Sequence, residues 1–240
     1  MRRILIIKTG STLPSLLASK GDFEHWILSG MGASRNQTFV VDVRDGSPLP
    51  AYNELSGVVV TGSHSMVTDH DDWSERTATW LAGAVEKVPI LGICYGHQLL
   101  AYALGGKVGD NPNGHEYGTV EVHLNENAHQ DSLLGGLLNP IQVHVSHTQS
   151  VTELPTQAKL LASSDRDPHQ AFVVGECAWG VQFHPEFDAE VVRAYIHHTR
   201  PVLLAEKQDP DRLIGQSTDT PYGSEILKRF IQLTCPRFQL

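Results

Sequence analysis

The sequence contains little cysteine: three residues in a chain of 240, at positions 94, 177 and 235. They lie far apart and none forms a C-x-x-C pair, which excludes a dense disulfide framework and a zinc site built on that motif. We therefore expect reduced thiols and a cytoplasmic location.

Long basic runs and long apolar runs are also missing. The formal net charge is −9 and no segment is rich in Lys and Arg, which argues against nucleic acid as a partner. The apolar run at residues 4–7 is much shorter than the core of a signal peptide, and Lys8 interrupts it. No later segment approaches the roughly 20 apolar residues of a membrane span. We expect small molecules or other proteins as partners, and no membrane.

Four short segments in the first hundred residues are apolar at consecutive positions, without the alternation of a half-exposed strand. Such runs predict strands buried on both faces, and hence a parallel sheet flanked by helices. Between the third and fourth runs, Asp72 and Glu75 have the spacing of a capping box, and residues 73–87 predict a crossover helix. The four runs are residues 4–7, 39–43, 58–60 and 90–93.

The residue composition changes after Leu104, where glycine becomes frequent. Residues 119–124 and 141–145 alternate more in polarity, which predicts antiparallel strands at the margin of the sheet. Residues 172–174 and 181–183 predict two more strands, with the turn between them at 176–180.

Beyond Pro185, residues 189–204 and 225–233 predict two helices separated by a polar loop. The sequence shows no internal repeat and no composition typical of a linker. We therefore predict one domain over residues 1–240, in which residues 187–240 form a C-terminal helical extension.

The strongest local signal is the segment GICYGHQ, in which Gly92 and Gly96 bracket Cys94 between a buried strand and a helix. This is the form of a nucleophile elbow, a turn too tight for a Cβ at the flanking positions. It places the thiol at a helix N-terminus, where the positive end of the helix dipole favours thiolate. The alternative is a buried cysteine that acts as a small apolar side chain, but the two glycines favour a nucleophile.

A thiolate that attacks an amide needs a proton donor for the leaving nitrogen, and histidine is the usual choice. His184 ends an apolar run and is followed by Pro185 and Glu186. At this spacing the Glu186 carboxylate can accept the second imidazole N–H and orient the ring. Taken alone, His-Pro-Glu is more often a histidine at a strand end beside a solvated carboxylate.

Together, the G-x-C-x-G-x-Q segment and the distal His-Pro-Glu resemble the class I, triad-type glutamine amidotransferases, over about residues 40 to 190. Within that family they are most similar to the glutaminase half of GMP synthase and its stand-alone relatives. The resemblance implies a flavodoxin-like, three-layer α/β/α fold with a central, mainly parallel sheet. Shorter matching pieces are residues 58–63, 104–106, 116–118 and 145–147.

The resemblance also implies roles for individual residues. Cys94 would be the nucleophile, His184 the base and Glu186 its orienting acid. Three further side chains would line the glutamine pocket: Gln98, Tyr117 and His147.

In the family, an oxyanion hole of two backbone N–H groups faces the nucleophile. The resemblance places one at Tyr95 and the other in the loop after the third strand, at Gly62 or Ser63. Many family members have Gly-Gly-Pro in this loop, whereas this chain has Thr-Gly-Ser. A backbone donor tolerates this difference, although the Ser63 side chain restricts the turn.

No cofactor and no metal is predicted. A G-x-x-x-x-G-K-[ST] phosphate loop is missing from the sequence. The acidic run at residues 69–72 lies where a helix needs an N-cap, which favours a capping role over a cation site. His197 and His198 are adjacent on a predicted helix, so they point apart, and we expect both to face solvent.

The reaction implied is hydrolysis of the glutamine side-chain amide through a cysteine thioester, which releases glutamate and ammonia. Because the chain has no phosphate loop, we expect the ammonia acceptor on a separate synthetase. One alternative is a hydrolase of γ-glutamyl peptides or conjugates within the same family. Another is a catalytically idle regulatory or binding protein, against which the intact Cys94, His184 and Glu186 argue.

Overall fold

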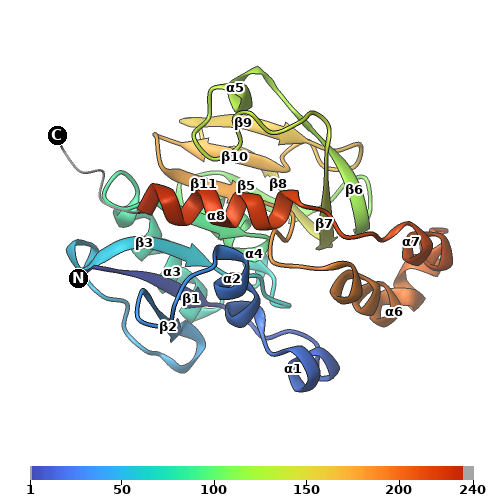
Figure 1. Cartoon of the computed structure of the whole chain (residues 1–240), viewed down its shortest axis with the longest axis horizontal. Helices are drawn as coiled ribbons and strands as arrows, with labels where there is room; N and C mark the ends of the chain where they lie inside the picture. Colours follow the sequence, from blue (N-terminus) through green and yellow to red (C-terminus); the bar gives the residue numbers. More distant parts are fainter. Residues whose placement is uncertain (1, 235–240) are drawn as a thin grey trace.

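The computed structural model describes residues 2–234, which form one large sheet with helices on both of its faces (Figure 1). The strand order is β2-β1-β3-β4-β11-β10-β9-β6-β7, and β5 (Lys107–Asp110) and β8 (Gln149–Glu153) form a separate antiparallel pair. The strands of the large sheet are β1 (Arg3–Lys8), β2 (Thr38–Asp42), β3 (Leu55–Val60), β4 (Ile90–Ile93), β6 (Glu116–Leu124), β7 (Ile141–His147), β9 (Ala158–Ser163), β10 (Ala171–Val174) and β11 (Ala178–Val181). The α-helices are α1 (Pro14–Lys20), α2 (Phe23–Met31), α3 (Asp72–Ala84), α4 (Tyr95–Ala103), α5 (Glu126–His129), α6 (Ala189–Ala205), α7 (Pro210–Gln216) and α8 (Tyr222–Thr234).

The sheet is mixed. The five strands from β2 to β11 run parallel to one another, whereas the four pairings from β11 to β7 are antiparallel. The predicted α/β fold, with parallel strands first and antiparallel strands at the margin, is confirmed. The antiparallel half is larger than a mainly parallel sheet implies.

Consecutive apolar residues in β1 are explained by a core on each face of the sheet. Ile4 and Ile6 pack with residues of α2 and α8, whereas Leu5 and Ile7 pack with residues of α3 and α4. All four side chains are almost fully buried. Each such side chain contributes roughly 1.5 to 3 kcal/mol through burial, so the parallel half of the sheet forms a rigid base for the loops at its carboxyl edge.

Two predicted details near the helix and strand ends are wrong. The N-cap of α3 is Asp71 rather than Asp72, it makes no side-chain cap hydrogen bond, and the helix ends at Ala84 rather than at residue 87. The last strand of the parallel half is Ala178–Val181 and not residues 181–183, since Trp179 pairs both with β4 and with β10. Most of the predicted turn at 176–180 is therefore strand.

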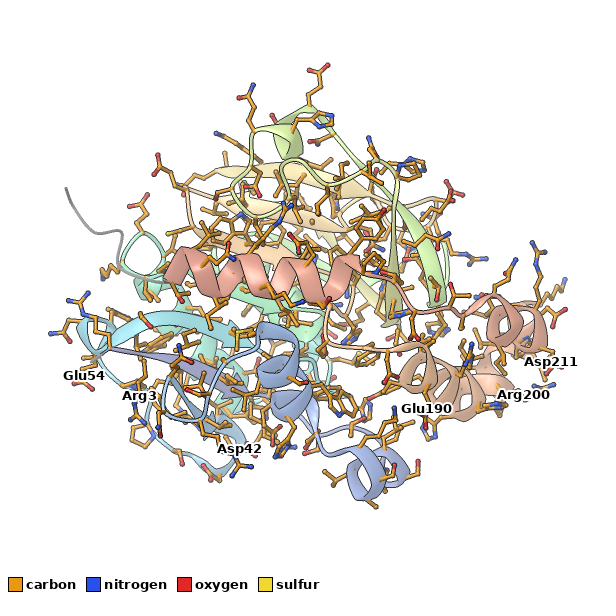
Figure 2. The ribbon with its side chains drawn as sticks, in the orientation of Figure 1. Arg3, Asp42, Glu54, Glu190, Arg200 and Asp211 are labelled. Atoms are coloured by element: carbon orange, nitrogen blue, oxygen red, sulfur yellow. The ribbon has the colours of Figure 1, made fainter. Side chains whose placement is uncertain are left out.

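The C-terminal third contains one helix more than predicted. Helix α7 occupies the segment interpreted as a polar loop, and Arg200 on α6 forms an exposed ion pair with Asp211 on α7 (Figure 2). Helix α8 is amphipathic, and Leu227 and Phe230 are fully buried in the core between α2 and the sheet. This packing supports our proposal that the chain is one domain, although residues 235–240 of the extension lie outside the described residues. Within residues 2–234, no helix has the length and apolar character needed to cross a bilayer.

Candidate active site

Cys94 sits at a sharp turn between β4 and α4. Its backbone has φ 50° and ψ −100°, a conformation that residues other than glycine rarely adopt. A Cβ at Gly92 would lie 2.4 Å from the Gly96 carbonyl oxygen, and a Cβ at Gly96 would lie 2.5 Å from the Val60 carbonyl oxygen. Both glycines are therefore needed for the turn to close, as an elbow requires.

His184 and Glu186 lie just past β11, the strand next to β4. The imidazole Nδ1 and the carboxylate Oε1 are 2.8 Å apart, and both side chains are buried. The Phe187 ring stacks on the imidazole with the ring centroids 4.0 Å apart. Because the carboxylate accepts a hydrogen bond from Nδ1, the other ring nitrogen is left free to exchange a proton.

The electrostatics of His184 follow from the same neighbours. Burial lowers the pKa of the imidazole. The charges of Glu186 and of a Cys94 thiolate raise this pKa, and together they outweigh the effect of burial. The net effect is a pKa well above the ordinary range for histidine. The environment therefore favours a protonated His184, which can deliver a proton to a leaving nitrogen.

The loop after β3 brings backbone to the same place. A Cβ at Gly62 would lie 2.9 Å from His184 Cε1 and 3.8 Å from Cys94 Cβ. The Gly62 carbonyl oxygen lies within hydrogen-bond distance of the Thr9 and Thr61 hydroxyls, at 3.1 and 3.0 Å, and the Thr9 hydroxyl also lies 2.9 Å from the Thr61 carbonyl oxygen. In a trans peptide the next N–H points the opposite way, so this clamp turns the Ser63 N–H away from the threonines.

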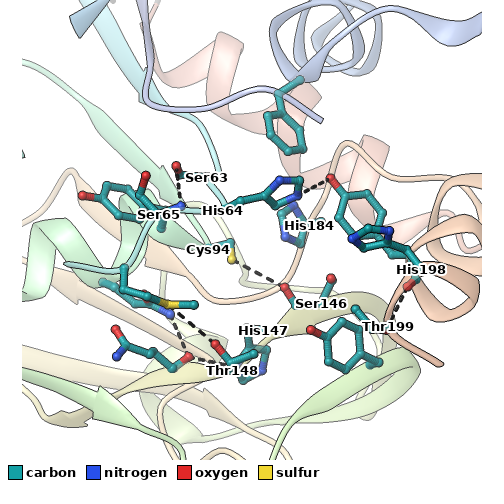
Figure 3. Close-up of a pocket in the computed structure, with 17 residues that line it drawn as sticks. Ser63, His64, Ser65, Cys94, Ser146, His147, Thr148, His184, His198 and Thr199 are labelled. Carbon is teal, nitrogen blue, oxygen red and sulfur yellow. Dashed lines mark hydrogen bonds between the residues drawn. The ribbon is translucent and has the colours of Figure 1, made fainter. Parts of the chain in front are cut away.

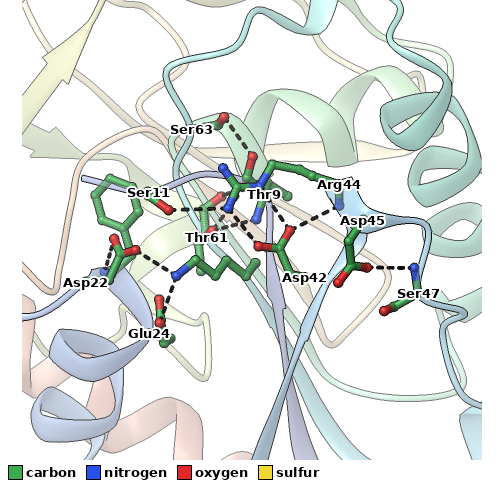
Figure 4. Close-up of polar contacts among 12 residues, drawn as sticks. Thr9, Ser11, Asp22, Glu24, Asp42, Arg44, Asp45, Ser47, Thr61 and Ser63 are labelled. Atoms are coloured by element: carbon green, nitrogen blue, oxygen red, sulfur yellow. Dashed lines mark hydrogen bonds and ion pairs between the residues drawn. The ribbon is translucent and has the colours of Figure 1, made fainter. Parts of the chain in front are cut away.

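The Ser63 side chain is accommodated without disturbing the loop. Its hydroxyl donates to the Thr9 carbonyl at 2.8 Å and accepts from the Ser65 backbone N–H (Figures 3 and 4). The side chain thus ties the loop to the end of β1. On the other side of the nucleophile, the Tyr95 N–H is the first of α4 and has no partner within the helix.

These elements surround a pocket of about 290 Å³ (Figure 3). Of the residues predicted for the site, Gly62 and Glu186 lie behind the pocket wall, against His184. The others line the pocket: Ser63, Cys94, Tyr95, Gln98, Tyr117, His147 and His184.

Gln98 presents one part of its amide to the pocket. Its Nε2 donates to the Gln149 carbonyl at 2.7 Å and to Gln182 Oε1 at 3.0 Å. A backbone carbonyl can only accept, which fixes the orientation of the amide. Both amide hydrogens are occupied, so the Gln98 carbonyl oxygen is the group available to a ligand N–H.

His147 was predicted to line the glutamine pocket, but both of its ring nitrogens are held by hydrogen bonds within the protein. Its Nδ1 donates to the Gln149 carbonyl and its Nε2 to Glu116, both at 3.0 Å, and Asp167 lies 4.0 Å away. Burial lowers the pKa of His147, but Glu116 and Asp167 outweigh it and the pKa is raised. Both ring nitrogens of His147 are therefore engaged with buried partners, and neither is free to contact a ligand.

Helix α6 contributes pocket residues that the sequence reasoning missed. Tyr195, His198 and Thr199 line the pocket, as does His64 from the loop after β3. His197 and His198 are both exposed, as expected, but His198 also lies at the pocket mouth. The sequence offers no signal for this, because the position of α6 over the pocket depends on tertiary packing.

The fold and the site define a class. A parallel α/β core carries at one edge a cysteine elbow, a buried His-Glu pair and a hydrogen-bonded loop after β3, an arrangement typical of triad-type cysteine hydrolases. Within residues 2–234, no group of three or more potential ligands is placed to hold a metal ion.

Comparison with known proteins identifies the family. The family model "Glutamine amidotransferase class-I" matches residues 19–198, so the chain belongs to the class I glutamine amidotransferases and is an enzyme of that family. A GMP synthase (glutamine-hydrolyzing) of Bacteroides thetaiotaomicron is 40% identical over 208 residues, covering 75% of this chain and 39% of the relative. The chain spans 19 to 39% of the length of the GMP synthases it matches.

Solved structures share the fold. A glutamine amidotransferase from Thermotoga maritima superposes with a TM-score of 0.70 at 24% identity, covering 97% of this chain and 96% of the other. A putative GMP synthase subunit from Thermoplasma acidophilum has a TM-score of 0.67 at 21% identity, covering 98% of this chain and 94% of the other.

Proposed function

We propose that this chain hydrolyses the side-chain amide of glutamine through a thioester on Cys94. The observation that carries the proposal is the strained elbow of Cys94 beside the buried pair His184–Glu186. The thiolate attacks the amide carbon, and the N–H groups of Tyr95 and of Ser63 stabilise the oxyanion. Protonated His184 then gives its proton to the nitrogen, which leaves as ammonia.

The second half of the reaction uses the same groups in reverse. His184, now neutral, takes a proton from water, which attacks the thioester carbon and releases glutamate and the Cys94 thiolate. Glu186 keeps the imidazole in one tautomer through both steps. No cofactor enters this scheme.

Substrate binding is proposed for the other pocket side chains. We infer that the Gln98 carbonyl oxygen accepts a hydrogen bond from the α-ammonium of the substrate and that Tyr117 covers its aliphatic part, which the free Gln98 oxygen and the pocket lining support. His147 supports the floor of the pocket rather than acting as a direct hydrogen-bond donor, because both of its ring nitrogens are engaged with Gln149 and Glu116.

The use of the ammonia is proposed from the relatives. The matched GMP synthases are named as glutamine-hydrolyzing and are much longer than this chain, and one solved relative is named as a putative GMP synthase subunit. We infer that ammonia passes to an acceptor held by a separate synthetase chain. A second candidate function, hydrolysis of γ-glutamyl conjugates, is favoured by the extension of the pocket along α6.

The test is release of glutamate and ammonia from glutamine, measured beside release of glutamate from a panel of γ-glutamyl amides. Turnover of glutamine supports the amidotransferase proposal. Rapid cleavage of γ-glutamyl peptides with none of glutamine would reject it in favour of the hydrolase. Inertness toward every γ-glutamyl compound would leave the idle binding protein as the explanation.

A further inference from the structure

The pocket has two ends, one on each side of Cys94. At one end lie His147 and Thr148, near the glutamine-binding groups described above (Figure 3). The other end continues past His184 to His198 on α6 (Figure 3). We call this second end the α6 wall, defined by His64, Tyr195, His198 and Thr199.

The α6 wall packs against the proposed base, His184, through the ring of Phe187. The Tyr195 ring stacks on Phe187 with centroids 5.2 Å apart, and Phe187 in turn stacks on His184. The Tyr195 hydroxyl lies 3.2 Å from His64 Nε2 and 3.0 Å from Thr12 Oγ1. These contacts hold His64 and α6 in a fixed place relative to the imidazole.

The chemistry determines what the α6 wall faces. The leaving nitrogen takes its proton from His184, so any group attached to that nitrogen extends toward the His184 end of the pocket. With glutamine the leaving group is ammonia, which carries only hydrogens and does not reach the wall. With a larger γ-glutamyl amide, the amine lies against His64, Tyr195 and His198.

The side chains that line the pocket favour an anion over a cation. The chain has 27 acidic and 18 basic residues, yet the described residues that line the pocket include four histidines and no Asp or Glu. Burial lowers the pKa of His64, and the positive charges of His198 and His184 lower it further. A carboxylate bound against His64 and His198 would accept hydrogen bonds from their imidazole N–H groups and would offset this mutual repulsion.

We propose that the α6 wall binds the leaving group of γ-glutamyl amides whose amine carries a carboxylate, as in γ-glutamyl amino acids, with His64 and His198 donating to that carboxylate. The proposal rests on the thioester mechanism above. The Cys94 sulfur forms a bond to the γ-carbon and the C–N bond breaks. The amine takes the proton of His184 and leaves as a free amino acid, and water then hydrolyses the thioester.

The test compares two substrates that differ only in the carboxylate: γ-glutamyl-alanine, whose amine product is alanine, and γ-glutamyl-ethylamide, whose product is ethylamine. Glutamate release gives kcat/KM for each, and their ratio is the readout. A hydrogen bond to a charged group predicts a ratio of about 10 to 100 in favour of γ-glutamyl-alanine. In His198→Gln and in His64→Gln the ratio is expected to fall toward one.

His197→Gln is the matched control, because His197 is the exposed neighbour on α6 and does not line the pocket. Its ratio should equal that of the unaltered protein. A ratio of one or less in the unaltered protein, or a preference that persists in both pocket variants, would overturn the proposal while glutamine turnover still supports the proposed function. If the unaltered protein turned over neither of these two amides nor glutamine, the thioester scheme itself would be rejected.

Discussion

At the scale of single residues, the site depends on a backbone conformation that is costly for a side chain. Cys94 is held at positive φ by the strand and helix on either side of it, and the adjacent glycines leave no space for a Cβ. Replacing Gly96 by Ala would press a methyl group against the Val60 carbonyl and shift the elbow. The thiol lines the same pocket as His184, and its Sγ lies 3.9 Å from the Ser146 carbonyl oxygen.

The first prediction is covalent labelling. A glutamine-like electrophile should add once, at Cys94, because its thiol is at a helix N-terminus inside the pocket, whereas Cys177 lies away from the pocket and burial raises its pKa. Intact-mass and peptide analysis provide the measurement. An adduct mapped to Cys177 or Cys235, with activity lost, would contradict the assignment of the nucleophile.

The second prediction ranks three substitutions. Cys94→Ala should lower kcat by roughly 10⁴-fold or more, and His184→Ala nearly as much, since the leaving nitrogen and the deacylating water both need it. Glu186→Gln should be the mildest, because only orientation and imidazolium stabilisation are lost. Single-turnover assays measure the order, and the losses should not add in double variants. Greater harm from Glu186→Gln than from His184→Ala would show that base and orienting acid are misassigned.

At the scale of elements, the ends of β1 and β3 cooperate to present the oxyanion loop. Thr9, next after β1, donates to the Gly62 carbonyl, and Ser63 after β3 donates back to the Thr9 carbonyl. Nearby, Lys8 pairs with Asp22 and Glu24 at 2.7 and 2.9 Å and joins β1 to α2 (Figure 4). Residues that follow the two neighbouring parallel strands therefore hold the loop in place through mutual hydrogen bonds.

The third prediction follows from this clamp. Thr9→Val removes the hydroxyl that holds the Gly62 carbonyl, so the Ser63 N–H loses its alignment and kcat should fall about tenfold, with little change in KM. Thr9→Ser keeps the hydroxyl and should retain most of the activity. An unchanged kcat in Thr9→Val would show that this hydroxyl does not align the Ser63 N–H.

At the scale of the whole molecule, buried histidines couple stability to pH. Burial lowers the pKa of His97 and of His144 to about 4, so both are neutral in the folded protein and take up protons on unfolding between about 4 and 6.5. His147 behaves in the opposite sense: its pKa is raised, so its stabilising charge is lost as pH rises. The two effects act on opposite sides of pH 6.5.

The fourth prediction is that the free energy of unfolding passes through a maximum near pH 6.5. Below pH 6.5, the free energy of unfolding should fall by a few kcal/mol down to about pH 4. His97 and His144 bind protons in the unfolded chain at these pH values but stay neutral in the folded protein. Above pH 6.5, stability should fall as His184 and His147, whose pKa values are raised in the folded protein, lose their protons. Urea unfolding across this range is the measurement. Replacing His97 by Leu should make the acid side less steep without abolishing its slope, because His144 remains, and an unchanged acid slope in that variant would contradict the account.

The local signals in the sequence were sufficient where the physics is local. Consecutive apolar residues in β1 and β4 predicted strands buried on both faces, and the glycines around Cys94 predicted the elbow, because sterics at a tight turn involve only neighbours. Helix α7 could have been found too. Asp209 caps its N-terminus and Pro210 is its first residue, which is a strong helix-start signal.

Other features were decided only by the tertiary structure. The boundary of β11 depends on pairing with two strands distant in the sequence, and the occupied N–H groups of His147 depend on Glu116, 31 residues away. The α6 wall arises because a helix that follows His184 by only a few residues packs back over the pocket. Sequence by itself determined the family, the elbow and the proposed nucleophile, since these rest on short-range geometry. The shape and charge of the pocket required the packing of distant segments, because no spacing along the chain specifies which side chains converge in space.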